Sequence, residues 1–496
     1  MLINLLRLCA PAAVLWGMAW GESIAQTPEP STESITGPSI KLEPCRIKDT
    51  AGIRGVDAEC GTLTVAENPD DPDGRQIDLF VARVKSLAPT SRPDAFTVIQ
   101  GGPGGSSIEA YVTLSGAFEP IRRVRDIILV DQRGTGRSNP LRCTFDSTDI
   151  TEMSEELTVE YTQKCLDDLD ADPRFYTTSV AVQDLEKVRQ ALGYESINVY
   201  GVSYGTRVAL HYLRRFPQSA RTVIIDGVAP ADWVLGPDIA LFGQEALDGI
   251  FQRCSDDPAC SEAFGDISQK FAELQQRLTE TPVEVSLQDP NTGEATTLDM
   301  NYQYVMGATR MFTYQTETAS LLPLLIHQAH QGNYAPMAAQ AQMVTAEIDK
   351  LLAMGMHNSV ICAEDVPFMP TVDGLEDTYM GETQVKALSA ICTVWPRGPM
   401  DEDFKQPVES DRPVLLLSGQ TDPVTPPRNA ERAAATLSNK LEVVVPAHGH
   451  GVAVRGCVPF LMDQFVEAAS FEELDTSCVD RLVPSPFFVT FSGPKP

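Results

Sequence analysis

Short apolar runs that suit strands alternate with helix-like segments through the first half of the chain. Near the start, "GTLTVAEN" and "QIDLFVARV" alternate apolar and polar positions on either side of a turn rich in Pro, Asp and Gly, which predicts a β-hairpin. The runs "AFTVIQ", "RDIILVDQ", "INVYGV" and "TVIIDGV" are typical of buried strands, whereas "SVAVQDLEKVRQALG" and "SYGTRVALHYLRRF" carry apolar residues at helical spacing. This alternation predicts a mostly parallel sheet with helices on both faces.

The strand rhythm stops at about residue 231 and returns after about residue 406. The interval is rich in helix-like segments such as "FGQEALDGIFQRC", "ISQKFAELQQRL" and "LLPLLIHQAHQG". Beyond it, apolar runs at Pro413–Gly419 and Leu441–Pro446 predict two more strands, and a last helix follows them. We therefore expect an α/β core formed by residues 41–230 and 407–496, with an inserted helical cap over residues 231–406.

The first 25 residues have the pattern of a cleaved export signal. One early Arg precedes an apolar run from Leu8 to Trp20, and Ser-Ile-Ala stands before Gln26. A membrane anchor is the alternative, but the run is shorter than the about 20 residues that a spanning helix needs. Residues 26–40 are rich in Pro, Ser, Thr and Glu and are expected to form a disordered lead-in. We expect a periplasmic or extracellular protein, cleaved after Ala25.

Charge excludes two classes of partner. The 496 residues carry a formal net charge of −30, and 43% of them are hydrophobic, which is ordinary for a globular protein. Nucleic-acid binding requires clustered Lys and Arg, and so does attachment to an anionic membrane surface. Neither is expected here, and no stretch after the signal is apolar enough to cross a bilayer.

The cysteines agree with export. Ten remain when Cys9 of the predicted signal is set aside, and an even number in an exported chain indicates disulfides. A zinc site is the alternative, but there is no C-x-x-C and no Cys/His cluster of zinc spacing, so no metal is expected. Connectivity does not follow from sequence, and pairing of nearest neighbours is our hypothesis: Cys45–Cys60, Cys143–Cys165, Cys254–Cys260, Cys362–Cys392 and Cys457–Cys478.

The segment "GVSYG", residues 201–205, fits the G-x-S-x-G turn that lifts a nucleophilic serine off the end of a sheet. Its position between a predicted strand and a predicted helix makes the match specific, since the pentapeptide alone is common. Glycines on both sides are needed because a Cβ would clash with the neighbouring strand and helix. Ser203 is therefore the candidate nucleophile.

A serine nucleophile needs a base and an acid that orients it. Of six histidines, His450 and His448 lie in a loop directly after the predicted strand that ends at Pro446, and we favour His450. Asp422 follows the preceding strand, and the order Ser203, Asp422, His450 matches that of α/β-hydrolases. Asp226 is the competing acid.

Stabilisation of an oxyanion needs two backbone N–H groups. We expect one from Tyr204, the residue after the nucleophile, and the other from Gly102 in the loop "QGGPGGSS". A phosphate-binding loop is excluded because no G-K-[ST] follows. In "DQRGTGRS", Asp131 and Arg133 are expected to form a buried structural pair.

Five motifs together resemble the secreted tripeptidyl aminopeptidases, which are related to the prolyl aminopeptidases. They are "GGPGGS", "DQRGTGRS", "GVSYGT", "SGQTDPVTPP" and "GHGVAVRGC", in the order of that family, and they span nearly all of the chain from Cys45 to Cys478. The resemblance implies an α/β-hydrolase fold with a cap. It also implies a serine peptidase that acts near free N-termini. Gln100 stands where prolyl aminopeptidases carry His, so strict proline specificity is not implied.

An aminopeptidase must recognise an α-ammonium group, and a carboxylate is the natural partner for a desolvated amine. Glu364 and Asp365 of the cap are candidates, with a plain solvated acidic pair as the alternative. We expect acyl transfer through Ser203 on peptides, without a metal or organic cofactor. A carboxylesterase with the same triad is the first alternative, and a non-catalytic binding protein of the same fold is the second.

Overall fold

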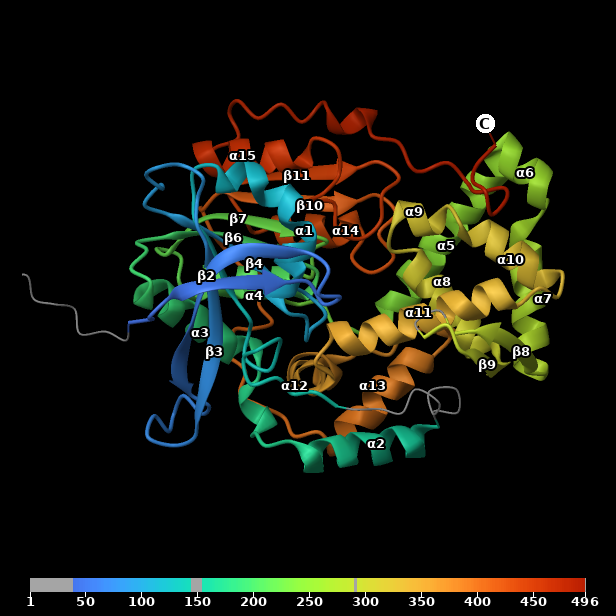
Figure 1. The fold of residues 1–496 in the computed structure, drawn as a ribbon, viewed down its shortest axis with the longest axis horizontal. Helices are drawn as coiled ribbons and strands as arrows, with labels where there is room; N and C mark the ends of the chain where they lie inside the picture. Colours follow the sequence, from blue (N-terminus) through green and yellow to red (C-terminus); the bar gives the residue numbers. More distant parts are fainter. Residues whose placement is uncertain (1–38, 144–153, 290–291, 496) are drawn as a thin grey trace, which may run out of the picture. The chain divides into compact units, whose positions relative to one another are not determined.

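The computed structural model describes residues 39–143, 154–289 and 292–495, so the predicted signal and most of the predicted lead-in lie outside the described residues. A nine-stranded sheet runs through the core in the order β1-β2-β3-β5-β4-β6-β7-β10-β11 (Figure 1). Strands β5, β4, β6, β7, β10 and β11 are parallel, and β1, β2 and β3 add an antiparallel edge. The bounds of these strands are Glu43–Lys48 (β1), Gly55–Ala66 (β2), Gln76–Val84 (β3), Ala95–Ile99 (β4), Ile127–Val130 (β5), Ile197–Val202 (β6), Ala220–Asp226 (β7), Val414–Gly419 (β10) and Lys440–Val445 (β11).

Helices cover both faces of the sheet. The α1 and α15 side chains share one apolar cluster with strand residues such as Phe96 and Leu417. Those of α3, α4 and α14 share the other cluster with Val199 and Leu416. Because adjacent residues of a strand point to opposite faces, Leu416 and Leu417 fall in different clusters. The expected α/β fold is thus confirmed. The helix bounds are Ser107–Arg122 (α1), Glu155–Asp168 (α2), Thr178–Ala191 (α3), Tyr204–Arg215 (α4), Pro427–Ala434 (α14) and Val458–Ala468 (α15).

The chain between β7 and β10 forms mostly helices around an apolar cluster of their own. It also contains a two-stranded antiparallel sheet that the sequence analysis did not anticipate, β8 (Val283–Gln288) and β9 (Ala295–Met300). The helices of this cap are Asp238–Asp256 (α5), Pro258–Phe264 (α6), Ile267–Glu280 (α7), Tyr302–Phe312 (α8), Thr316–Ala319 (α9), Leu322–His330 (α10), Ala335–Leu351 (α11), Met354–Glu364 (α12) and Thr383–Val394 (α13). Among the described residues, no helix is long and apolar enough to cross a membrane.

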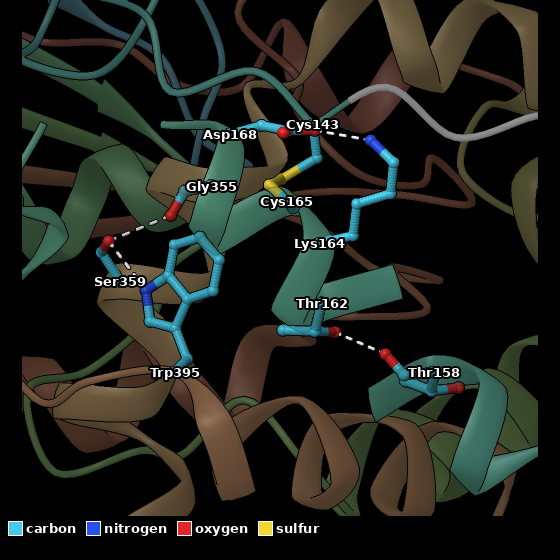
Figure 2. Close-up of a disulfide and its surroundings, with 9 residues drawn as sticks. All are labelled: Cys143, Thr158, Thr162, Lys164, Cys165, Asp168, Gly355, Ser359 and Trp395. Atoms are coloured by element: carbon cyan, nitrogen blue, oxygen red, sulfur yellow. Dashed lines mark hydrogen bonds and ion pairs between the residues drawn. A yellow bond between two sulfur atoms is a disulfide. The ribbon is translucent and has the colours of Figure 1, made fainter. Parts of the chain in front are cut away.

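All five expected cysteine pairs are disulfides in the structure. Figure 2 shows the Cys143–Cys165 bridge, which ties α2 to the preceding loop, beside the Trp395 indole. The indole N–H donates to Ser359 Oγ at 3.1 Å, and Ser359 Oγ donates to the Gly355 carbonyl at 3.0 Å. Helix α2 precedes the G-x-S-x-G turn in the sequence. It packs against the cap helices α12 and α13 in one apolar cluster.

The disulfides differ in the length of chain that they close. Replacing Cys362 and Cys392 together by Ala opens a 30-residue loop, whereas replacing Cys254 and Cys260 opens a six-residue loop. From loop-closure entropy, we expect the first double variant to lose about 3–4 kcal/mol of unfolding free energy and the second about 2 kcal/mol. Denaturant unfolding checks the order, and a larger loss for the shorter loop would contradict it.

Candidate active site

Ser203 occupies a strained bend between β6 and α4. Its backbone has φ 58° and ψ −127°, in the positive-φ region that L-residues avoid. Hydrogen bonds on both sides hold the bend. The Ser203 N–H donates to the Asp226 carbonyl at 3.0 Å, and the Thr206 hydroxyl donates to the Ser203 carbonyl at 2.6 Å. The predicted strand–turn–helix placement of this serine is therefore present.

The flanking glycines are required by direct contact. A Cβ on Gly205 would lie 2.2 Å from the Ile99 carbonyl oxygen of β4, and a Cβ on Gly201 would lie 2.2 Å from the Gly205 carbonyl oxygen. Both atoms belong to the backbone and cannot rotate away. The elbow can approach the neighbouring strand only if neither position carries a side chain.

His450 and Asp422 form a hydrogen-bonded pair in the loops after β11 and β10. The distance from His450 Nδ1 to Asp422 Oδ2 is 2.8 Å. The other oxygen of Asp422 accepts from the N–H groups of Val424 and Thr425, at 2.9 and 2.8 Å. The Thr425 hydroxyl lies 3.0 Å from Asp422 Oδ2 and 3.1 Å from His450 Nδ1. The sequence analysis did not single out Thr425, although its place three residues after Asp422 suits a side chain that closes the same turn.

Asp422 and His450 shift each other's pKa values. Burial opposes ionisation of Asp422, but the His450 charge, its hydrogen bond and the two N–H donors outweigh burial and lower the pKa of Asp422. Burial also opposes protonation of His450. The charge of Asp422 and the hydrogen bond to it outweigh burial and raise the pKa of His450. An ionised carboxylate thus faces an imidazole that it stabilises in the protonated state.

The loop that carries His450 lies against the chain next to Ser203. A Cβ on Gly227, the residue after Asp226, would lie 3.0 Å from His450 Cε1, and one on Gly451 would lie 3.7 Å from Val202 Cγ2. The His450 N–H donates to the Tyr314 carbonyl at 2.8 Å, and the two rings meet edge to face at 5.3 Å. Tyr314 follows cap helix α8, and its role had no signal in the sequence.

The five other histidines have different partners or positions. His448 Nδ1 lies 2.8 Å from the Pro446 carbonyl, so the alternative base faces its own strand end. His211 lies 2.8 Å from Asp401. The remaining three, His327, His330 and His357, lie in the cap. Only His450 contacts the acid that was predicted to orient the base.

Asp226, the competing acid, holds the His450 loop by its backbone instead. Its carboxylate accepts from the N–H groups of Val452 and Ala453, each at 2.9 Å, and from the Tyr200 hydroxyl at 2.9 Å. Burial raises the pKa of Asp226, and these donors act against that rise. Asp226 therefore supports the loop on which His450 stands.

The glycine-rich loop passes directly over the nucleophile. A Cβ on Gly101 would lie 2.6 Å from Ser203 Cβ and 3.1 Å from Ser203 Oγ. Among the residues that the structure describes, the Gly102 N–H has no protein acceptor. Tyr204 is the first residue of α4, where an N–H has no partner within the helix. Both expected donors thus lie in the segments that border Ser203.

Glu364 and Asp365, the acids expected to bind a substrate amine, lie beside Thr178 and Arg207. Both are buried, with 0% and 1% of the residue exposed, so they are not a solvated surface pair. Asp365 accepts from both terminal nitrogens of Arg207, at 3.0 and 2.9 Å. Glu364 accepts from the backbone N–H and the hydroxyl of Thr178, at 2.7 and 2.9 Å. Each of the four carboxylate oxygens thus has a protein donor, and the ammonium-binding role of this pair stays a prediction.

The "DQRGTGRS" loop is structural, but its expected pairing is wrong. Arg133 is fully buried and forms a bidentate contact with Asp184, at 2.6 and 3.0 Å. Asp131 instead accepts from the Ser106 hydroxyl at 2.6 Å and from the N–H groups of Ile108 and Arg137. The Asp184 contact joins this loop to α3, a pairing across 51 residues that the sequence pattern did not signal.

Comparisons with known proteins agree with this fold. The model of the alpha/beta hydrolase fold family matches residues 94–454. A tripeptidyl aminopeptidase of Streptomyces coelicolor is 24% identical over 472 residues, which cover 86% of this chain and 84% of that protein. The serine protease Hip1 of Mycobacterium tuberculosis H37Rv is 30% identical over 215 residues, covering 39% of this chain and 40% of that protein. Carboxylesterase B of Mycobacterium tuberculosis CDC 1551 is 31% identical over 285 residues, covering 52% and 53%.

The close approach at the elbow can be tested with paired glycine substitutions. Gly205→Ala places its methyl group 2.2 Å from the Ile99 carbonyl, whereas Gly249→Ala in α5 meets nothing within 4 Å. We expect Gly205→Ala to lose more than 2 kcal/mol through overpacking and Gly249→Ala to gain up to about 1 kcal/mol from helix propensity. Denaturant unfolding measures both, and equal stability of the two variants would contradict the assigned contact.

Proposed function

The chain belongs to the α/β-hydrolase fold family, and from that premise we propose that it is an exported serine peptidase that cleaves residues or short peptides from free N-termini. The observation that carries the proposal is the Ser203 elbow beside the Asp422–His450 pair. The similarity to a tripeptidyl aminopeptidase over 86% of the chain supports the substrate class. The five disulfides support an oxidising compartment outside the cytoplasm.

In the proposed mechanism Ser203 Oγ attacks the carbonyl carbon of the scissile bond while His450 Nε2 takes the hydroxyl proton. Asp422 holds Nδ1–H of the imidazole, fixes its tautomer and stabilises the imidazolium that forms. The N–H groups of Tyr204 and Gly102 donate to the oxyanion of the tetrahedral intermediate. His450 then protonates the leaving amine. Water, activated by the same imidazole, hydrolyses the acyl-enzyme and frees Ser203.

We further propose that residues 231–406 act as a cap that selects substrates. Its contact with the site supports this role, because Tyr314 of the cap accepts a hydrogen bond from the His450 backbone and packs against the imidazole. The Gln315 side chain of the cap also donates to the His450 carbonyl at 2.7 Å. The cap therefore contributes to the position of the base as well as to access.

A carboxylesterase is the second candidate, and the similarity to carboxylesterase B over 52% of the chain favours it. The same nucleophile, base and oxyanion donors would hydrolyse an ester, whose leaving group departs more easily than an amine. A peptide anilide with a free N-terminus, its N-acetylated form and a short-chain ester together separate the two functions. Preference for the free peptide supports the peptidase, and turnover of the ester alone supports the esterase.

Ser203→Ala tests the nucleophile. We expect wild type to be labelled by a fluorophosphonate and to cleave the free peptide anilide. The variant should show no labelling and a loss of kcat of at least about 10³-fold, because no covalent intermediate can form. Intact-mass analysis and anilide release measure the two outcomes. Cleavage by Ser203→Ala at the wild-type rate would contradict the mechanism.

The His450–Asp422 pair predicts the pH dependence. Only neutral imidazole can act as the base, so kcat/KM should fall as pH drops through the His450 pKa, which lies above its ordinary value of about 6.5. Asp422→Asn removes the charge that raises this pKa, so the acid limb should move to lower pH. At the plateau kcat should fall by about 10⁴-fold because the tautomer is no longer fixed. An unchanged acid limb in Asp422→Asn would show that another group controls it.

A further inference from the structure

Glu364 is a buried carboxylate that the proposed mechanism does not use. It is the last residue of cap helix α12 and has no exposed surface. Its oxygens accept from the Thr178 N–H at 2.7 Å and from the Thr178 hydroxyl at 2.9 Å. The nearest cation in ion-pair contact is Arg207, whose Nη1 lies 3.6 Å from Glu364 Oε2. Burial raises the pKa of Glu364 to about 7 despite that cation and the two donors.

Thr178 connects this carboxylate to the side chain of Tyr204. The distance from Thr178 Oγ1 to the Tyr204 hydroxyl oxygen is 2.6 Å. While Glu364 is ionised, Thr178 donates its single hydroxyl hydrogen to Glu364, so the Tyr204 hydroxyl donates to Thr178. The Tyr204 hydroxyl oxygen also accepts from Gln132 Nε2 at 3.1 Å. The Tyr204 hydroxyl, in a residue only 6% exposed, is thus fixed by one donor and one acceptor.

The same cap helix holds the elbow helix and the glycine-rich loop at further points. Arg207, three residues after Tyr204 in α4, is bound in bidentate fashion by Asp365, the residue after Glu364. At the other end of α12, the Ala353 N–H donates to the Gly104 carbonyl at 3.0 Å. Leu352 also forms a β-bridge with Gly105. One cap segment therefore contacts the segments that carry both expected oxyanion donors.

We propose that Glu364 is a positioning residue for the oxyanion hole, acting through Thr178 and the Tyr204 hydroxyl on the Tyr204 N–H. This inference rests on the proposed function, in which that N–H stabilises the tetrahedral intermediate. An oxyanion donor acts by its fixed direction, because the protein need not reorganise as charge develops. In Tyr204 the oxyanion donor is the backbone N–H, and the group held in place by hydrogen bonds is the side-chain hydroxyl. A shift of the anchored ring therefore moves the donor, while groups that bind the rest of the substrate stay in place.

The test compares Tyr204→Phe, Glu364→Gln and the double variant with Tyr212→Phe. Tyr212 is the matched control: it lies in the same helix, is also buried, and its hydroxyl donates to the carboxylate of Glu186 at 2.8 Å. Tyr204→Phe removes the hydroxyl but leaves the N–H, and Glu364→Gln keeps the shape of the acceptor but removes its charge. The measurements are kcat and KM on the free peptide anilide, the rate of fluorophosphonate labelling, and unfolding free energy.

We expect each of the two single variants to lower kcat and the labelling rate about tenfold, with KM within twofold of wild type. This is less than the 10²–10³-fold cost of deleting a donor, because the N–H remains. The double variant should lose about tenfold rather than a hundredfold, since both changes break one chain of hydrogen bonds. Tyr212→Phe should lose stability but keep its kcat.

Three results would overturn the proposal. Equal kcat in Tyr204→Phe and Tyr212→Phe at similar losses of stability would make the network merely structural. Multiplicative losses in the double variant would show that Glu364 does not act through Tyr204. A rise in KM that is limited to substrates with free N-termini would instead indicate that Glu364 binds the amine.

Failure of the proposed function is distinguishable, because wild type would then be neither labelled at Ser203 nor active on peptide or ester. If only the ester is cleaved, kcat on the ester gives the same comparison.

Discussion

The backbone of Ser203 in its positive-φ conformation is the constraint from which the site follows. A residue with a side chain adopts it only when the surrounding structure holds it there. Here α4 begins at Tyr204, β6 ends at Val202, and the glycines at 201 and 205 let the bend press against β4. Because the loop of Gly101 directly follows β4, the contact of the bend with β4 also places this loop over Ser203. The bend therefore sets the direction of the hydroxyl, the start of the helix and the distance to the second oxyanion donor together.

Buried carboxylates surround this bend, and each has a different task because each has different donors. Asp422 faces the imidazole and stays ionised because His450 and two N–H groups stabilise its charge. Asp226 accepts from the backbone N–H groups that follow His450. It therefore holds the loop of His450 and does not bind the imidazole Nδ1. Glu364 has Thr178 and Arg207 as its partners. In this chain of net charge −30, each of these three buried carboxylates thus has hydrogen-bond donors in place.

The segment between β7 and β10 makes direct contact with the candidate site. Tyr314 and Gln315 bind the His450 backbone, and the segment that contains α12 binds the glycine-rich loop and the elbow helix. Helix α2 packs against α12 and α13 in a cluster that contains the Cys143–Cys165 and Cys362–Cys392 disulfides, of which Figure 2 shows the first. Substitutions in this segment can therefore disturb the positions of the candidate catalytic residues. This coupling gives a physical reason for treating cap residues near Ser203 as part of the site.

The sequence by itself determined the parts of this protein that are local. Strand and helix periodicity predicted the core and the G-x-S-x-G spacing predicted the turn at Ser203, because each depends on neighbours along the chain. The nearest-neighbour hypothesis for the cysteines was confirmed only by the structure. It did not reveal β1, the β8–β9 hairpin, the partner of Arg133 or the burial of Glu364 and Asp365. The partner of Arg133 and the burial of these two acids depend on contacts such as Arg133 with Asp184 and Thr178 with Glu364, 51 and 186 residues apart. Only the tertiary structure decided which carboxylates meet a histidine, an arginine or a hydroxyl, because packing of distant segments sets the environment of a buried charge.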